Sequence, residues 1–294
     1  MAEDGSVMLA ETQGPLGILA GGGPFPGQVA AAARAAGRPV FIVGFEDFAD
    51  QAVIGAYPHA YARLGAAGRI LSLLREHAVR DLVLVGPVKR PSLLDLRPDF
   101  EGTKILARIG RAAWSGDDGL LAALVRVLAE EGFSVLGAHE ILTASVAPQG
   151  TLGAVAPDAQ AMADIARGAQ IVRALGVLDV GQGCVVQQGF VLAVEAAEGT
   201  DRMLARVGEL AVQGQGGVLV KLTKPGQERR ADMPTIGPRT ITAAAAAGLR
   251  GVACEAGGTL LTDRDACIAE ADRLGLFLYG IDADLADKEA SASF

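Results

Sequence analysis

One segment of the chain concentrates side chains that can bind and cleave phosphate groups. Residues 224–240, KPGQERRADMPTIGPRT, hold four cations, two carboxylates, three prolines and two glycines. Arginine binds phosphate oxygens through paired hydrogen bonds and lysine acts as a point charge. The candidate phosphate ligands in and just before this segment are Lys221, Lys224, Arg229 and Arg230. Asp232 stands among them, and their field is expected to keep its carboxylate ionised, ready to bind a metal or orient a water.

The backbone of this segment is expected to form an ordered loop, because its prolines and glycines exclude a regular helix. A helical pattern follows, and its N-terminus adds a favourable potential for anions. Further candidates for substrate contact are Gln227, Thr235, Gly237 and Thr240. A cationic clamp, a helix end and one carboxylate are the parts of a phosphoryl-transfer site. The alternative is an exposed, salt-bridged loop.

Three shorter stretches are weaker candidates. Gly21, Gly22 and Gly23 follow the first predicted strand, where glycines let a backbone approach a phosphate, although a tight strand-to-helix turn explains them equally well. In SGDDGLL, Asp117 and Asp118 are candidate metal or ribose ligands, but capping of the following helix is the favoured interpretation.

The stretch AVEAAEGTDRM, residues 193–203, places three carboxylates around the end of a predicted strand. Glu195 stands at the strand end, and Glu198 and Asp201 flank a Gly-Thr turn. They could face a crevice at the carboxyl end of the sheet or form a solvated turn. Thr200 or Asp201 is expected to cap a helix over 200–213, and both are candidate substrate contacts.

The elements that must position these residues alternate between strand and helix patterns. Buried strands are predicted at 16–23 (a short strand running into a glycine loop), 38–45, 80–88, 184–196 (two strands around Gly189), 217–223, 251–257 and 277–281. Helices are predicted at 28–37, 68–79, 101–113, 117–131, 160–176, 200–213, 239–248 and 263–275. Alternation of this kind predicts βαβ units and a mainly parallel sheet. The expected fold class is α/β with two domains: 1–13 a tail, 14–143 a Rossmann-like βαβ domain, 144–158 a linker, 159–282 a mixed α/β domain carrying the catalytic loop, and 283–294 a tail.

Composition narrows the class of partner. The 294 residues are 50% apolar and 4% aromatic, with a net charge of −8, and no long run of Lys and Arg occurs. Nucleic acid is therefore not an expected partner, whereas a local basic cluster suits a small anionic ligand. Three widely separated cysteines without CxxC spacing suggest buried, reduced thiols in a cytoplasm-like compartment, and no signal peptide or membrane-spanning stretch is expected.

Four of these stretches together resemble a known family. They are LGILAGGGPFP (16–26), SGDDGLL (115–121), VEAAEGTD (194–201) and KLTKPGQERRADMPTIGPRT (221–240), of which the last is the most specific. The chain resembles, from about residue 14 to about residue 282, the LpxI-type UDP-2,3-diacylglucosamine pyrophosphatases.

The resemblance implies a two-domain enzyme of lipid A biosynthesis. Such an enzyme hydrolyses UDP-2,3-diacylglucosamine to UMP and 2,3-diacylglucosamine 1-phosphate (lipid X) and requires a divalent cation, usually Mg²⁺. It implies that Asp232 is the catalytic carboxylate, which either ligates the metal or activates the attacking water. A lipid-nucleotide substrate further implies a cytoplasmic protein with peripheral contact at the inner membrane surface. A homodimer is expected only because two-fold assemblies are common.

Two other functions remain open at this point. The first is an NAD(P)-dependent oxidoreductase on the N-terminal domain, which lacks the glycine fingerprint but has Glu46 or Asp47 about 25 residues after its glycine loop. The second is a non-catalytic module that binds a nucleotide sugar or lipid. Asp232 argues against it, because a pure phosphate site gains little from a carboxylate unless a metal is present.

Overall fold

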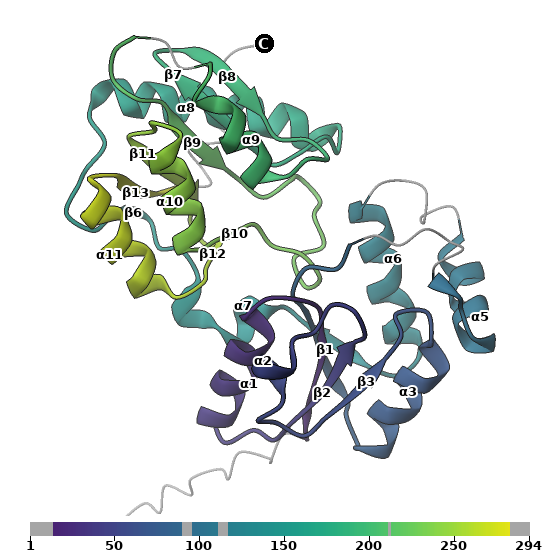
Figure 1. Ribbon diagram of the computed structural model, residues 1–294. Helices are drawn as coiled ribbons and strands as arrows, with labels where there is room; N and C mark the ends of the chain where they lie inside the picture. The colour runs from purple at the N-terminus through teal and green to yellow at the C-terminus, as the bar shows by residue number, and fades with distance from the viewer. Residues whose placement is uncertain (1–13, 90–95, 111–116, 211–212, 283–294) are drawn as a thin grey trace, which may run out of the picture. The chain divides into compact units, whose positions relative to one another are not determined.

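A computed structural model describes residues 14–89, 96–110, 117–210 and 213–282. The predicted tails, 1–13 and 283–294, lie outside the described residues. Internal contacts divide the chain into two units that meet in sequence between Ile141 and Leu142. Each unit has its own sheet with helices packed on it (Figure 1). The expected α/β fold class with two domains is confirmed.

The first unit is built on a five-stranded sheet in the order β3-β2-β1-β4-β5, and all its pairings are parallel. Its strands are β1 (Leu16–Ala20), β2 (Val40–Phe45), β3 (His59–Ala62), β4 (Asp81–Val85) and β5 (Ser134–Leu136). Its helices are α1 (Phe25–Ala35), α2 (Gln51–Ile54), α3 (Ala67–Glu76), α5 (Phe100–Ile109), α6 (Asp117–Glu130) and α7 (Ala138–Ile141). The strand order reverses between β1 and β4, which is the switch point of a Rossmann-like sheet.

The second unit is built on a six-stranded mixed sheet in the order β6-β13-β11-β9-β7-β8. Its strands are β6 (Gly150–Leu152), β7 (Gly183–Gln187), β8 (Phe190–Val194), β9 (Val218–Lys221), β11 (Gly251–Glu255) and β13 (Phe277–Ile281). Strands β9, β11 and β13 are parallel, β7 runs antiparallel to both β9 and β8, and β6 runs antiparallel to β13. Two short strands, β10 (Thr235–Ile236) and β12 (Leu260–Leu261), pair separately.

Helices cover both faces of this six-stranded sheet (Figure 1). They are α8 (Ala159–Val177), α9 (Thr200–Val207), α10 (Pro238–Ala246) and α11 (Arg264–Leu274), and a 3₁₀ turn, η2 (Thr143–Ser145), begins the unit. Val218 and Val220 of β9 pack with α8, and Leu219 packs with α9, α10 and α11. Because side chains alternate along a strand, Lys221 is directed toward the face of α9. By the same alternation, Glu255 of β11 is directed toward α8.

The segment predicted as a linker, 144–158, contains a short strand in the second unit. Residues 142–158 belong to the second unit, and β6 pairs antiparallel with β13 through Leu152 and Leu278. The sequence suggested a linker because the segment is rich in Pro, Gly and Ala and has no apolar period. A three-residue strand is too short to show that period. The same limitation hid α2 and β3, each only four residues long.

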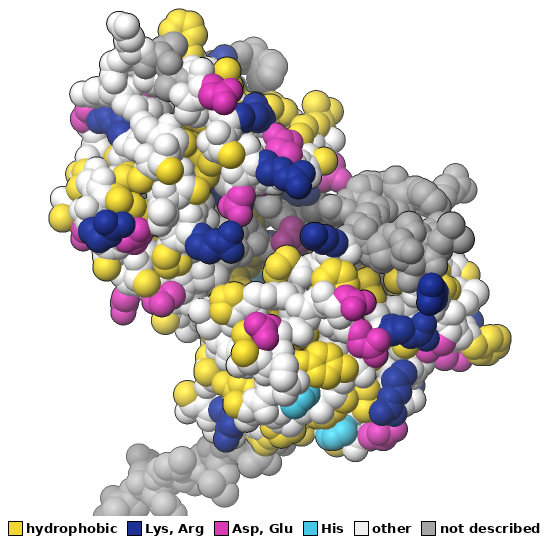
Figure 2. Space-filling view, in the orientation of Figure 1, with side chains coloured by type: hydrophobic (Ala, Val, Ile, Leu, Met, Phe, Trp, Pro, Cys, Tyr) yellow, Lys and Arg dark blue, Asp and Glu magenta, His cyan; other side chains and the backbone are white. Residues whose placement is uncertain are grey.

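The three cysteines are buried and unbonded, as the sequence predicted. Burial raises the pKa of Cys184, Cys254 and Cys267 to about 12. Their thiols therefore stay protonated and unreactive at neutral pH. Among the described residues, no helix combines the length and hydropathy that crossing a bilayer requires. On the visible faces, acidic and basic side chains are interspersed (Figure 2).

Candidate active site

Several polar side chains meet at one edge of the six-stranded sheet. Lys221, the last residue of β9, lies opposite Gly183 of β7 on one side and Cys254 of β11 on the other. Glu195 directly follows β8, and its amide donates to Gly183 O (2.8 Å). Glu255 ends β11 at the same level. This is the carboxyl edge of the parallel strands, where open α/β sheets bind their ligands.

On the α9 side of this edge, three side chains form a hydrogen-bonded chain. Lys221 Nζ donates to Thr200 Oγ1 (2.8 Å), and the Thr200 hydroxyl donates to Glu195 Oε1 (2.9 Å). Lys221 and Glu195 are both buried, each 7% exposed. The predicted cap of α9 is thereby corrected, because the N-cap is Gly199 with φ of 78° and the Thr200 side chain binds the network instead. The partners of Thr200 are Glu195, five residues upstream, and Lys221 at the end of β9.

The three carboxylates of the 193–203 stretch lie in different surroundings. Glu195 faces the sheet edge, whereas Glu198 pairs with Arg206 (2.8 Å), which lowers the pKa of Glu198. The side chain of Asp201 is 71% exposed and lies 3.9 Å from Arg239. Only one of the three therefore belongs to the buried edge, and the other two form the solvated turn that was the alternative.

On the α8 side of the edge, a second network fixes the start of the loop. Arg173 of α8 donates to Thr223 O (2.8 Å) and pairs with Glu255 (3.2 Å). Thr223 N donates to the same carboxylate (3.1 Å), and Thr223 Oγ1 donates to Gly258 O (3.0 Å). The sequence analysis did not identify Arg173 or Glu255. Glu255 carried a usable signal, since it ends a buried strand at the carboxyl edge, whereas Arg173 looked like any other charged residue of a helix.

Replacing Arg173 by Met should lower the free energy of unfolding by about 3–5 kcal/mol, because it leaves the buried Glu255 carboxylate without its counter-ion. Urea denaturation followed by circular dichroism measures the change. The matched double variant Arg173→Met/Glu255→Gln should lose less free energy of unfolding than Arg173→Met alone, because it leaves no unpaired buried charge. A loss below about 1 kcal/mol in the single variant would mean that the pair contributes no more than an exposed one.

Between Thr223 and β10, the loop positions Asp232 through Gln227. Gln227 is buried, and its Oε1 accepts from Lys224 N (3.1 Å) while its Nε2 donates to Asp232 Oδ2 (2.7 Å). Asp232 N donates to Glu228 O (3.0 Å). No described residue donates to Asp232 Oδ1. The loop is ordered, as predicted, and it presents one carboxylate with a single oxygen available to a ligand.

Most cations of this loop already have partners within the second unit. Lys224 pairs with Asp179 (2.7 Å) in the turn after α8. Arg229 donates to the carbonyl oxygen of Gly257. Arg230 pairs with Glu228 (2.6 Å) and lowers the pKa of that carboxyl group. Lys221 differs, because among the described residues its ammonium group donates to a neutral group, the Thr200 hydroxyl.

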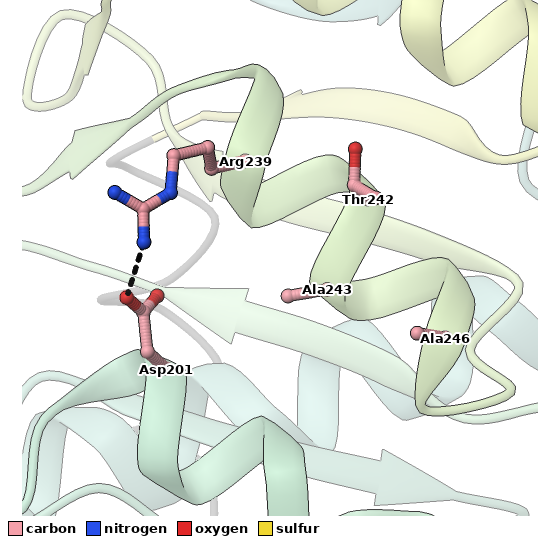
Figure 3. Close-up of a pocket in the computed structure, with 5 residues that line it drawn as sticks. All are labelled: Asp201, Arg239, Thr242, Ala243 and Ala246. Carbon is pink, nitrogen blue, oxygen red and sulfur yellow. Dashed lines mark ion pairs between the residues drawn. The ribbon is translucent and has the colours of Figure 1, made fainter.

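The remaining predicted loop residues lead into α10. Thr235 Oγ1 donates to Met233 O (3.1 Å), and Thr240 Oγ1 accepts from Gly237 N (3.5 Å) at the start of the helix. An open cavity of about 390 Å³ lies beside this helix end, and Asp201, Arg239, Thr242, Ala243 and Ala246 line it (Figure 3). Asp201 comes from the first turn of α9 and Arg239 from that of α10. The cavity has a charged rim and a floor of alanine methyl groups.

In the first unit, the glycine loop is packed against a neighbouring loop. Gly21 N donates to Val85 O (2.9 Å) and Gly22 N donates to Pro87 O (3.0 Å). Two of the three predicted phosphate-binding amides are therefore engaged by backbone oxygens, as the tight-turn alternative expects. Gly23 is exposed with φ of 75° and precedes α1.

Replacing Gly21 by Ala should lower the free energy of unfolding by about 1–3 kcal/mol, because the added Cβ would lie 2.4 Å from Gly86 O and the loops would have to separate. Gly208→Ala is the control, since Gly208 has open space and φ of −57°. Thermal unfolding of both variants measures the difference. Equal melting temperatures would show that the loops separate at little cost.

The last predicted site lies at the start of α6 in the first unit. Asp117 and Asp118 are the first two residues of the helix, and their side chains lie outside the described residues. Among the described residues, no three His, Cys, Asp or Glu side chains form a cluster that could hold a metal.

Comparison with known proteins places the chain in a family. Residues 15–145 match the model of the LpxI N-terminal domain, and residues 148–279 match that of the LpxI C-terminal domain. A relative from Caulobacter vibrioides, UDP-2,3-diacylglucosamine pyrophosphatase LpxI, is 45% identical over 273 residues, which cover 91% of this chain and 97% of that protein. UDP-glucose 4-epimerase of Thermus thermophilus, solved with NAD, aligns with 91% of this chain and 86% of its own at 13% identity and a TM-score of 0.30, too low to support an argument. The two domain matches and the identity to the Caulobacter protein show that the chain belongs to the LpxI family.

Proposed function

We propose that this protein hydrolyses the pyrophosphate bond of UDP-2,3-diacylglucosamine, releasing UMP and 2,3-diacylglucosamine 1-phosphate in lipid A biosynthesis. The relative that is 45% identical carries this substrate in its name. The observation that carries the proposal is Asp232, a carboxylate with one available oxygen on an ordered loop that begins at a buried lysine. The loop thus supplies a base or metal ligand and the strand before it a positive charge, the two groups that pyrophosphate hydrolysis requires.

A divalent cation fits this site if the substrate supplies part of its coordination. Mg²⁺ is commonly held by one or two carboxylates together with substrate phosphates and waters. Asp232 Oδ1 has no recorded donor among the described residues, and Gln227 holds Oδ2 so that the carboxylate keeps its orientation. We assign Asp232 as the residue that would hold the metal. When bound, the metal would neutralise charge on the phosphate oxygens.

The residues of the chain have separate tasks in this reaction. Lys221 binds phosphate oxygens, and the N-terminus of α9, whose Thr200 it contacts, adds positive potential near it. Asp232 orients the attacking water or accepts its proton. The Arg173–Glu255 network keeps the loop start in place, so that Asp232 is held relative to Lys221. Because the substrate carries two acyl chains, we place the enzyme in the cytoplasm with peripheral contact at the inner membrane surface.

Purified protein supplied with UDP-2,3-diacylglucosamine and Mg²⁺ should release UMP, and a chelator should abolish the release until Mg²⁺ is added back. Chromatography of the nucleotide product measures both steps. Tight binding of the substrate without any UMP would favour the non-catalytic binding module instead. Release that persists in excess chelator would remove the metal from the proposal and leave Asp232 as a proton acceptor.

A further inference from the structure

The carboxylate of Glu195 occupies a space that the sheet leaves open for it. Glu195 and Lys221 are two strands apart, roughly 10 Å between backbones, with Gly183 of β7 between them. A Cβ on Gly183 would lie 2.5 Å from Glu195 Oε2, and a Cβ on Gly181 would lie 2.0 Å from Glu195 O. The two long side chains therefore extend toward each other over a strip of glycine backbone, and Thr200 joins them.

Both the Glu195 carboxylate and the Lys221 ammonium group can form further hydrogen bonds. Glu195 Oε2 is buried and has no hydrogen-bond partner among the described residues. Lys221 has three N–H donors and one recorded acceptor, the Thr200 hydroxyl, and forms no ion pair within the described part of the chain. The Glu195 carboxylate, one hydroxyl away, offsets part of the Lys221 charge, but the other N–H groups of the buried ammonium have no acceptor among the described residues and can bind an anion. All three linked side chains lie at the carboxyl edge of the parallel strands, and Lys221 is the one that carries the positive charge to which an anion can bind.

We propose that Glu195 and Thr200 are positioning residues that aim the Lys221 ammonium group at the phosphates of the substrate. The Thr200 hydroxyl has one proton, and Glu195 accepts it, so the oxygen lone pairs are turned toward Lys221. Lys221 then has one N–H held by Thr200 and two left for phosphate oxygens. The proposal rests on the proposed function, and it adds that Glu195 and Thr200 orient the lysine.

A purely structural role for these residues predicts a different pattern. Thr200 stands in the first turn of α9, where its methyl group and backbone would serve packing equally well without the hydroxyl. Under that role, valine would replace threonine at no cost to phosphate binding, and serine, which loses the methyl group, would be the poorer substitute. The positioning role predicts the reverse order.

The test compares Thr200→Val with Thr200→Ser by two measurements. The first is kcat and KM for UDP-2,3-diacylglucosamine, and the second is the Kd of inorganic pyrophosphate by calorimetry. Thr200→Val should raise both KM and this Kd roughly five- to ten-fold. Thr200→Ser keeps the hydroxyl and should stay within about three-fold of wild type. Equal values for the two variants, or a larger defect in Thr200→Ser, would overturn the proposal.

A second pair of variants keeps the test valid if Thr200→Val folds poorly. Glu195→Gln retains an oxygen that can accept from Thr200 and should bind pyrophosphate nearly as well as wild type. Glu195→Met removes the acceptor at similar length and should weaken binding as Thr200→Val does. Glu195→Met with unchanged affinity would overturn the proposal. If wild type binds pyrophosphate but releases no UMP, the proposed reaction fails while the Kd comparison still decides the positioning role.

Discussion

Asp232→Asn protein should hydrolyse UDP-2,3-diacylglucosamine about 10²- to 10⁴-fold more slowly than wild type while still binding it. The substitution keeps the size of the side chain and an oxygen that can accept from Gln227 Nε2, so the loop should keep its fold. It removes the negative charge and the basicity that a metal ligand or a proton acceptor needs. The loss should therefore appear in kcat, with a small change in the Kd of the substrate.

The matched control for this variant is Glu228→Gln on the same loop. Glu228 is bound by Arg230, which lowers the pKa of Glu228, so its charge is already offset within the protein. The rate of hydrolysis by Glu228→Gln protein should stay within about three-fold of wild type, because an exposed ion pair contributes little free energy. If Glu228→Gln were as slow as Asp232→Asn, the activity would depend on the net charge of the loop and not on one carboxylate.

Lys221→Met protein should show a kcat/KM about 10- to 100-fold below wild type, because it loses a charge-assisted contact to phosphate. Methionine matches the length of the lysine stem and can fill the same buried path. Lys221 is 7% exposed and has no counter-ion among the described residues, so its charge is available to a ligand. The pyrophosphate Kd should rise by a similar factor.

Lys224→Met provides the comparison, since Lys224 already pairs with Asp179 (2.7 Å). Its charge is offset within the protein, and its loss should reduce kcat/KM less than the loss of Lys221 does. Steady-state kinetics of the two variants side by side gives the ranking. A larger defect in Lys224→Met would mean that the Asp179 pair opens when substrate binds and that the structure's ranking of the cations is wrong.

Local sequence patterns were enough to predict the fold class and to predict that residues 224–240 form an ordered loop. Buried strands such as β1 and β2 read as apolar runs because helices cover both faces of a parallel sheet. Pro225, Gly226 and Pro234 indicated an ordered loop because their effect on the backbone is local. The composition of the loop also identified Asp232 and Lys221 as candidates.

Pairings between distant segments could not be predicted in the same way. Whether Gly21 N binds a phosphate or Val85 O depends on how β1 and β4 sit beside each other, which no local pattern records. The sequence alone does not distinguish the four cations Lys221, Lys224, Arg229 and Arg230. Their difference lies in Asp179, Gly257 and Glu228, the partners that three of them find. Glu195 likewise became informative only once Gly183 was seen to make room for it.

The most direct test of the central claim is a single-turnover assay with enzyme in excess over UDP-2,3-diacylglucosamine, with wild type and Asp232→Asn run side by side. Enzyme excess separates binding from chemistry, because every substrate molecule is bound at the start. Wild type should convert the bound substrate to UMP, and Asp232→Asn should hold it unhydrolysed on that timescale. Equal UMP release from both proteins would contradict the account and place the reacting carboxylate elsewhere.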